Sequence, residues 1–571
     1  MIYFTSIAID IFCLSIISVF LNIYYNIRLN HAFLISICLC GLLLYTAYII
    51  FSIQYLKYFI YSYFLITILI SFKIFLDNKI KKENINLLLE FLIICLIISI
   101  FSWNRYYLDE DELNHWGKIV KYFHNVSNPD FENLFVYLYH KPFLPLVHFF
   151  NSFFSGFKED ISIFSNNLFI VSGFYFVFYN KQIYFLKRIF LFIIFYLCLN
   201  SLSFGLVSIY ADPIISILYL CIVILIYSYR DNYKYQFFFI IFILCTSLFL
   251  AHRSGIVYIF FATIFWIAFH GYKNIKYLIL LILTSLVLIY YILTHSLINY
   301  NFFDLYSFKF FLKNFLFVDI YFSDFGLSFN TILSFFKISN FKFPQLNINV
   351  LFWLILILLI LFFNYKKNFK IVIFILLQFF LYSIAIYIFK IKIGELSILV
   401  YGRYIGIFFL SALLFCIFIT SLEKNKLNTY ILLSVFFVLL SITPNKTYGF
   451  LLPNNLFLQQ EQNLNFWEQK QAIKKIYSKL KLDHEVFVVT GSAKSKKTLY
   501  HPSMPFSLMN FEFFPIFSNS WMIRTVSFYD YVNKLKNFLH PNIIFYNFTP
   551  EEKEVIQKLS GRDDLIYLNF Q

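Results

Sequence analysis

The sequence predicts a helical protein that crosses a membrane many times and ends in a small α/β domain. Hydrophobic residues make up 60% of the chain, charged residues make up 13%, and the mean hydropathy is +0.73. A soluble chain of 571 residues needs more polar surface than this composition supplies. Apolar stretches of membrane-spanning length recur until about residue 442, and backbone at that depth must satisfy its hydrogen bonds as helix. We therefore expect an all-α polytopic domain at 1–442 and an extracytoplasmic (periplasmic) α/β domain at 443–571.

Hydropathy over windows of about 19 residues predicts about fourteen transmembrane helices. Only a few residues separate some neighbouring helices, notably around 54–57 and 251–254. The predicted helices are 3–25, 33–53, 57–76, 85–103, 161–179, 184–204, 213–229, 236–251, 254–271, 277–294, 348–364, 370–389, 402–421 and 428–442.

Basic residues between these helices predict the orientation in the membrane. They fall in alternate connections, and connections rich in Lys and Arg stay in the cytoplasm. The opposite side then receives loop 104–160, loop 295–347 and everything after residue 443. This pattern predicts a multi-pass protein of the inner (plasma) membrane with an extracytoplasmic tail. The basic residues are Arg28, Lys79, Lys81, Lys82, Lys181, Lys187, Arg188, Arg230, Lys234, Lys273, Lys276, Lys366, Lys367, Lys370, Lys424 and Lys426.

The distribution of charge and cysteine excludes two other classes of protein. The net charge of +16 is spread over short connections, without the basic stripe and stacking aromatics of a nucleic-acid-binding domain. Most of the eight cysteines lie within apolar stretches. We therefore expect no nucleic-acid partner, no disulfide framework and no zinc site.

The C-terminal tail alternates between helical and strand patterns. Gln459–Leu482 is a polar helix-like stretch, and Glu485–Thr490 has the composition of a buried strand. A helical stretch at Tyr529–Leu539 precedes a second short strand at Asn542–Tyr546. Thr549 then precedes Pro and two acids, which is typical of a helix N-terminus. This alternation predicts a small α/β domain.

An acidic stretch at Asp109–Glu112 opens the long loop 104–160. Apolar residues follow it at three- and four-residue spacing, which predicts an amphipathic helix at the membrane interface with a tryptophan at headgroup level. These residues are Leu113, Trp116, Val120 and Phe123.

The four carboxylates of this stretch divide by position. Asp109 and Glu112 fit a capping box at the start of the helix. Asp111 and His115 are four residues apart and therefore share a helix face. Helix capping does not explain the pairing of Asp111 with His115. It also does not explain four adjacent like charges, which cost free energy and persist more often at functional sites than elsewhere. Asp111 is the stronger candidate for chemistry.

Further polar residues are predicted at the same side of the membrane, each close to a helix end. They have structural explanations too, because Asp before Pro is a good helix cap and Arg can snorkel to the interface. Together they bring carboxylates and cations to one side, where Lys and Arg can bind phosphate. The residues are Lys141, Asp212, His252, Arg253 and Arg403.

At this point the sequence resembles a known family. The segment Asp111–Gly117 is similar to the acidic D-E-aromatic-S-H-W-G segment of bacterial multi-spanning proteins related to the GT-C glycosyltransferase superfamily. Lys141–Pro145, Tyr210–Asp212 and Arg253–Gly255 resemble further short signatures of those proteins. Here about three additional helices precede the acidic stretch, and Leu and Asn replace the aromatic and Ser of the motif.

The resemblance implies a glycosyltransferase that takes a sugar from a polyprenyl-phosphate donor, normally with inversion, and gives it to an envelope glycan, lipid or protein. A carboxylate deprotonates the acceptor, and cations stabilise the leaving phosphate. No cofactor is required, although a divalent Mg or Mn ion at Asp111 and Asp212 stays open. The implied catalytic residues are Asp111, with Glu112 as the alternative base, His115 as an orienting partner and Asp212 as a second acid. The implied phosphate contacts are Lys141, His252, Arg253 and Arg403.

Other functions remain open on the residues alone. An O-antigen polymerase or ligase would use Arg and His in a large external loop, but loop 295–347 contains no Arg. A lipid-linked glycan transporter or flippase would need ionisable groups at membrane depth, for which Asp10 and Glu90 are the candidates. A non-catalytic scaffold whose tail binds a partner is a further alternative.

Overall fold

A computed structural model describes most of the membrane part of the chain and short pieces of the tail. The described residues are 2–77, 81–103, 116–125, 142–179, 183–201, 211–228, 235–252, 255–270, 350–362, 370–381, 401–422, 426–442, 487–490, 524–527, 543–546, 549–560 and 566–568.

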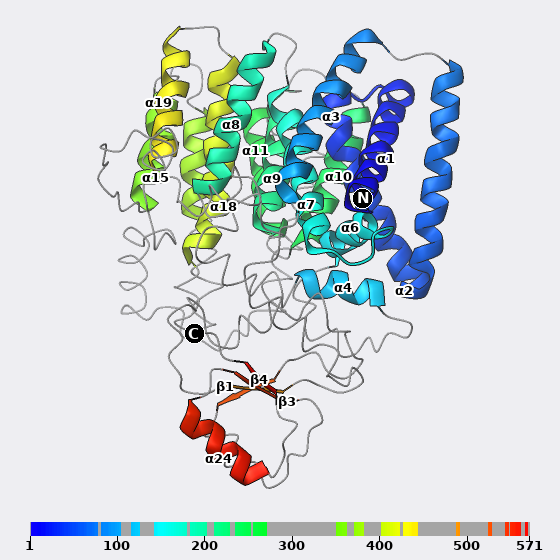
Figure 1. Cartoon of the computed structure of the whole chain (residues 1–571). Helices are drawn as coiled ribbons and strands as arrows, with labels where there is room; N and C mark the ends of the chain where they lie inside the picture. Colours follow the sequence, from blue (N-terminus) through cyan, green and yellow to red (C-terminus); the bar gives the residue numbers. More distant parts are fainter. Residues whose placement is uncertain are drawn as a thin grey trace, which may run out of the picture.

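The described membrane part is a bundle of helices (Figure 1). Its first half contains α1 (Ile2–Tyr25), α2 (Leu29–Asp77), α3 (Lys82–Ser102), α4 (Lys118–Asn125), α6 (Phe143–Ser152), α7 (Glu159–Phe178), α8 (Phe185–Ser201) and α9 (Ala211–Ser228). Its second half contains α10 (Tyr235–Ala251), α11 (Gly255–His270), α15 (Val350–Phe362), a helix at Lys370–Leu381, α18 (Tyr401–Leu422) and α19 (Lys426–Ile442).

Within the described residues, six helical segments are long and apolar enough to cross a membrane. They are Tyr3–Tyr25, Leu29–Phe51, Tyr55–Asp77, Lys82–Ser102, Glu159–Phe178 and Ala211–Ser228. The protein is therefore a multi-pass membrane protein. The predicted helix 277–294 lies outside the described residues, and the predicted total of fourteen remains a prediction.

Helix α2 contains two of these segments and is a hairpin. Its 49 residues would extend about 73 Å as a straight helix at 1.5 Å per residue. Both of its ends instead lie beside the end of α1. The first end follows α1 directly in the chain. At the second end the Tyr24 hydroxyl donates to Asp77, and Lys73 Nζ lies 5.0 Å from the centre of the Tyr24 ring. The two arms are the helices predicted at 33–53 and 57–76, and the chain reverses between them.

The core of the bundle is centred on α7 and α9. The 18-residue apolar window of α7 is entirely buried. Gly173 of α7 faces Ile217 of α9, and a Cβ built at Gly173 would lie only 2.1 Å from Ile217 Cγ2. The missing side chain therefore lets the two helices approach closely, as small residues do in membrane helix pairs.

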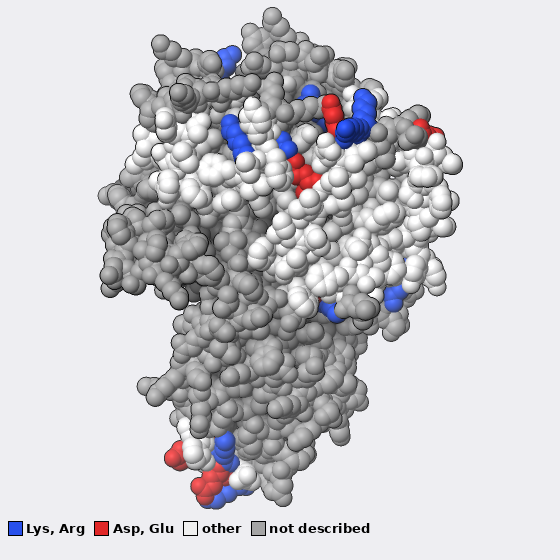
Figure 2. Space-filling view, turned by 45° about the horizontal axis from the view of Figure 1, so that its top comes forward, with Lys and Arg blue, Asp and Glu red and all other residues white. Residues whose placement is uncertain are grey.

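The two ends of the bundle differ in charge. We call the end where α1, α7 and α9 finish the basic face, because Arg28, Lys81 and Lys187 lie beside those helix ends. Figure 2 shows many of the Lys and Arg side chains towards the top of the view, beside some Asp and Glu, with further Lys or Arg at the lower edge of a broad uncharged band and in the tail. We call the opposite end, where α1, α7 and α9 begin, the loop face.

Four short parallel strands and one helix are described in the tail. The strands are β1 (Phe487–Thr490), β2 (Arg524–Ser527), β3 (Ile543–Tyr546) and β4 (Ile566–Leu568), in the order β2-β1-β3-β4. The predicted strands at Glu485–Thr490 and Asn542–Tyr546 correspond to β1 and β3. Figure 1 shows the sheet beyond the loop face, on the side of α4. Most of 443–571 lies outside the described residues, so the complete α/β domain remains a prediction.

Helix α24 (Pro550–Ser560) starts with the predicted cap. The backbone N–H of Glu552 donates to Thr549 Oγ1 at 3.2 Å, and the backbone N–H of Thr549 donates to Glu552 Oε2 at 2.9 Å. This reciprocal pair is a capping box, which satisfies backbone donors that the first turn leaves open.

Candidate functional site

The sequence-predicted site residues are described to different extents. Asp212 and His252 are described with their side chains, and both are buried. Arg403 lies in the first turn of α18, where only its backbone is described. The remaining predicted residues, Asp111, Glu112, His115, Lys141 and Arg253, lie outside the described residues.

The structure packs α9 against α18 just beyond the first turn of each helix. Ser216 Oγ donates to the carbonyl of Ile407 at 3.1 Å, and Ser411 Oγ donates to the carbonyl of Ser216 at 3.3 Å. Asp212 and Arg403 each precede this contact by one helical turn, towards the loop face. The two predicted site positions therefore lie at the same depth on neighbouring parallel helices. Helix α9 starts at Ala211, so Asp212 lies within the first turn and does not take the cap position that was predicted.

Helix α11 starts deeper in the bundle than α9, because Tyr258 is three residues into α11 and its neighbour Tyr219 is eight residues into α9. The Tyr219 ring of α9 and the Tyr258 ring of α11 are 5.2 Å apart. A tight turn joins α10 to α11, in which the Gly255 N–H donates to the His252 carbonyl at 3.0 Å. A Cβ at Gly255 would lie 2.0 Å from the Leu248 carbonyl oxygen, so this turn requires glycine. His252 therefore lies between α10 and α11, and both of these helices pack against α9.

These helix beginnings are recessed into the bundle. Gly173 is fourteen residues into α7, whereas its neighbour Ile217 is six residues into α9. At 1.5 Å per residue, α9 begins about 12 Å deeper than α7. Asp212 is only 3% exposed at this depth. An acid there is shielded from bulk water, and the helix N-termini around it carry positive partial charge.

Helix α4 lies across the loop face (Figure 1) and directly follows the acidic stretch. Its apolar side is buried, with Val120 at 0% and Phe123 at 3% exposure, which confirms the predicted amphipathic helix over 118–125. Trp116 is 2% exposed and belongs to the hydrophobic core, so its ring packs against the protein.

A histidine that the sequence analysis did not select attaches α4 to the bundle. His124 Nε2 lies 2.8 Å from Ser152 Oγ of α6, and Ser152 Oγ donates to the His148 carbonyl at 2.7 Å. Burial, with a smaller effect of Lys57, lowers the pKa of His124 to about 4. The docked position therefore favours the neutral ring.

The sequence leaves open a metal at Asp111 and Asp212. No group of three His, Cys, Asp or Glu side chains among the described residues could hold a metal ion. Asp111 lies outside the described residues, so a metal there stays a prediction.

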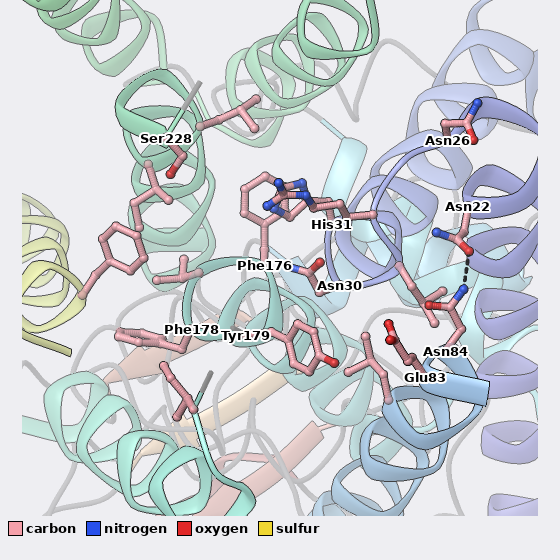
Figure 3. Close-up of a pocket in the computed structure, with 18 of the residues that line it drawn as sticks. Asn22, Asn26, Asn30, His31, Glu83, Asn84, Phe176, Phe178, Tyr179 and Ser228 are labelled. Atoms are coloured by element: carbon pink, nitrogen blue, oxygen red, sulfur yellow. Dashed lines mark hydrogen bonds between the residues drawn. The ribbon is translucent and has the colours of Figure 1, made fainter. Parts of the chain in front are cut away.

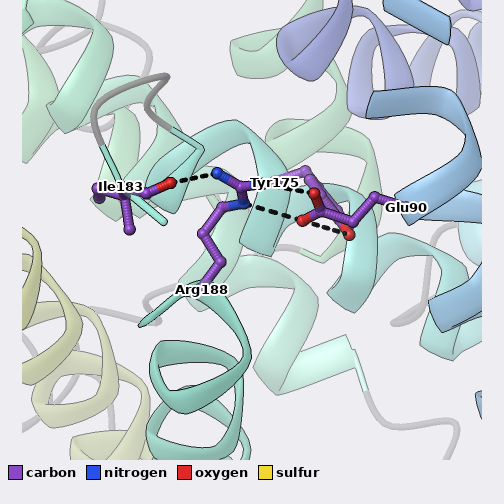
Figure 4. Close-up of polar contacts among 4 residues, drawn as sticks. All are labelled: Glu90, Tyr175, Ile183 and Arg188. Carbon is purple, nitrogen blue, oxygen red and sulfur yellow. Dashed lines mark hydrogen bonds and ion pairs between the residues drawn. The ribbon is translucent and has the colours of Figure 1, made fainter. Parts of the chain in front are cut away.

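Asp10 and Glu90 lie within membrane-spanning helices and away from the helix ends. Glu90 of α3 pairs with Arg188, whose Nε and Nη2 lie 2.9 and 2.6 Å from the two carboxylate oxygens (Figure 4). Arg188 also donates to the Ile183 carbonyl, and the Tyr175 hydroxyl donates to Glu90 at 3.3 Å. Glu90 therefore has a structural role, because it forms a two-contact ion pair with Arg188 close to the basic face.

Asp10 of α1 has a different environment. Its side chain is 3% exposed, and its carboxylate oxygens have no hydrogen-bond partner among the described residues. It lines a cavity of about 20 Å³ with Cys13, Cys40 and Tyr63. A space of this size holds roughly one water molecule. Asp10 is therefore the intramembrane acid that the described packing leaves unexplained.

A large cavity lies at the basic face, and the sequence analysis did not predict it. Its volume is about 970 Å³, and polar residues from α1, α2 and α3 line much of it (Figure 3). Arg28 and Lys81 were interpreted only as topology signals. The sequence does carry a sign of this site, because three Asn and one His crowd into ten residues at 22–31. The polar lining includes Asn22, Asn26, Arg28, Asn30, His31 and Asn84.

The chain matches no protein-family model, no curated protein and no solved structure. Functional assignment therefore depends on the arrangement of these residues.

Proposed function

We propose that this chain is a membrane glycosyltransferase that acts at the loop face. It takes a sugar from a polyprenyl-phosphate-linked donor and transfers it to a hydroxyl group of an envelope glycan, lipid or protein. The observation that supports this most is the packing of α9 against both α18 and α11. Helices α9 and α18 begin at a similar depth and carry Asp212 and the position of Arg403, and His252 lies just before α11.

The proposed reaction is an inverting displacement at the anomeric carbon. Asp111, or Glu112 in its place, takes the acceptor hydroxyl proton while the oxygen attacks this carbon. The bond to the phosphate oxygen breaks, and its electron pair leaves with the phosphate. Cations and helix N-termini stabilise this charge best in a site shielded from water. We assign that role to Lys141, Arg253 and Arg403, with His252 beside them.

The position of these helix beginnings suits a lipid-linked donor. Its polyprenyl chain would lie among the apolar helices, while its phosphate would reach the helix beginnings at the loop face. Helix α4 would hold the end of the acidic stretch against α6 through His124. His115 and Asp111 would then approach the donor from the loop face. The predicted α/β domain would lie on the same side and contact the acceptor or cover the site.

The sharpest test compares two neighbouring carboxylates. We expect Asp111→Asn to abolish transfer and change the cell-envelope glycans, because the base is lost. Asp109→Asn removes only a predicted helix cap and should leave the glycans close to normal. Both variants would be checked for membrane insertion and amount. An inserted Asp111→Asn protein with unchanged glycans would refute the catalytic assignment.

A second candidate function is transport of a lipid-linked glycan coupled to protons, and Asp10 is the observation that favours it. An unexplained acid within the membrane is a feature of proton relays. We expect a transporter to lose all activity in Asp10→Asn and to keep it in Asp111→Asn. A glycosyltransferase should show the reverse order, so the same glycan assay separates the two functions.

A further inference from the structure

The cavity at the basic face is built from two unlike sides. On one side α2 and α3 begin, next to Arg28 and Lys81. On the other side α7, α9 and α18 end, next to Tyr179, Ser228 and Ser421. Helix beginnings carry positive partial charge and helix ends carry negative partial charge. One side therefore favours an anion, and the other favours groups that donate hydrogen bonds.

Amide side chains at this cavity are held in position by the protein. Asn84 Nδ2 donates to Asn22 Oδ1 at 2.6 Å, and Asn22 Nδ2 donates to the Ile27 carbonyl at 2.8 Å. Asn30 Nδ2 donates to the Tyr175 carbonyl at 3.3 Å. Figure 3 shows Asn22, Asn84 and Glu83 on one side of the cavity and Ser228 on the other. Ordered amides and a carboxylate suit a ligand with several hydroxyl groups.

The size and the floor of the cavity restrict its ligand further. A volume of about 970 Å³ falls in the range of pockets for small organic molecules and is far larger than an inorganic ion needs. The rings of His31 and Phe176 stack at 4.2 Å and form part of its lining. Arg28, Lys81 and Glu83 together carry a formal charge of +1, which suits one phosphate diester or a partly neutralised monoester.

We propose that this cavity binds the phosphate ester of a polyol or sugar, with the phosphate beside Arg28 and Lys81 and the hydroxyls towards Ser228 and Ser421. The ligand is either the headgroup of an anionic lipid or a free sugar phosphate. The cavity lies at the face opposite the glycosyltransferase site, so this inference does not depend on the proposed function. It adds a second polar site at the side of the membrane that carries the topogenic charges.

The test uses the full-length protein in nanodiscs and two probes. Glucose 1-phosphate is titrated against protein in phosphatidylcholine nanodiscs, and the thermal midpoint is compared between phosphatidylcholine and phosphatidylglycerol nanodiscs. The double variant Arg28→Gln, Lys81→Gln should weaken binding of the effective probe about tenfold or more, because it loses two charge-assisted contacts. Lys82→Gln is the matched control, since Lys82 is exposed beside Lys81 but does not line the cavity.

Each outcome either identifies the source of the ligand, a lipid headgroup or a free sugar phosphate, or contradicts the proposal. Binding of glucose 1-phosphate identifies a free sugar phosphate, whereas stabilisation by phosphatidylglycerol alone identifies a lipid headgroup. Ser228→Trp should fill the cavity and block either probe without changing the charge. The proposal fails if neither probe binds, if the double variant binds like the parent protein, or if Lys82→Gln weakens binding equally. Unfolding midpoints without probe show that the variants are folded.

Discussion

At the scale of single residues, the docking of α4 depends on an uncharged histidine. His124 has a pKa of about 4 in the folded protein because of burial, against an ordinary value of 6.5. Between these values the undocked segment binds a proton that the docked segment does not, so docking weakens as pH falls from 6.5 towards 4. We expect hydrogen exchange at 118–125 to accelerate at pH 5 relative to pH 7, after correction for intrinsic rates. In His124→Gln this pH dependence should be absent, and a persistent dependence would assign it to another group.

The ion pair between Glu90 and Arg188 gives a second prediction at this scale. The two side chains are 10% and 13% exposed, and leaving one charge of such a pair alone costs roughly 3–5 kcal/mol when burial is complete. We expect Glu90→Gln to lower the thermal midpoint clearly. The double variant Glu90→Gln, Arg188→Gln should recover part of the loss, because no single charge is then left. A double variant less stable than either single variant would contradict this explanation.

The candidate site was predictable from the sequence only where a residue marks a helix end. Asp212 and His252 were selected because they flank apolar stretches at the predicted outer side, and the structure places both at such ends. The cavity at the basic face was missed because Arg28 and Lys81 already had an explanation as topology signals. Which distant helix ends meet, such as α9 and α18, is set by long-range packing that hydropathy does not encode.

At the scale of elements, the contact between α7 and α9 depends on the absence of one side chain. Gly173→Ala would place a Cβ 2.1 Å from Ile217 Cγ2, so one of the helices must shift. We expect a marked loss of folded protein, measured as the monodisperse fraction after extraction. The compensating change Ile217→Ala should restore much of it, and failure of this rescue would show that Gly173 has another role.

Helix α24 offers a smaller and independent effect. Thr549→Ala removes the side-chain acceptor of the Glu552 N–H and should cost about 1 kcal/mol. We expect faster hydrogen exchange in 550–560. Thr549→Ser keeps the hydroxyl and should behave like the parent protein, whereas equal exchange in Ala and Ser variants would exclude the cap as the cause.

The positions of the membrane helices could be predicted well from the hydropathy of the sequence, and their ends less well. Apolar stretches predicted the described helices because a spanning helix must be apolar over its whole length. The bend of α2 was predicted only as a short gap, since no Gly or Pro marks it. Trp116 was expected at the headgroups because tryptophan often lies there, but packing against the bundle buries it.

At the scale of the whole molecule, the hairpin of α2 makes a prediction about topology. Lys57 and Lys81 are both exposed but lie at opposite faces. We expect an impermeant maleimide added to intact cells to label Lys57→Cys and not Lys81→Cys. The native cysteines are buried or half-buried, so the parent protein supplies a low background. Labelling of both positions from one side would refute the hairpin and the assigned faces together.

The second arm of α2 has a consequence for handling the protein. Only 17% of its apolar window, within Tyr55–Asp77, is buried, and Phe75 and Leu76 are 81% and 79% exposed. This arm of 23 residues is about 35 Å long, a little more than the roughly 30 Å hydrocarbon core of a bilayer. Acyl chains, and not neighbouring helices, therefore supply most of its van der Waals contacts. Delipidation should loosen this arm before the core, so the annular lipid is effectively part of the fold.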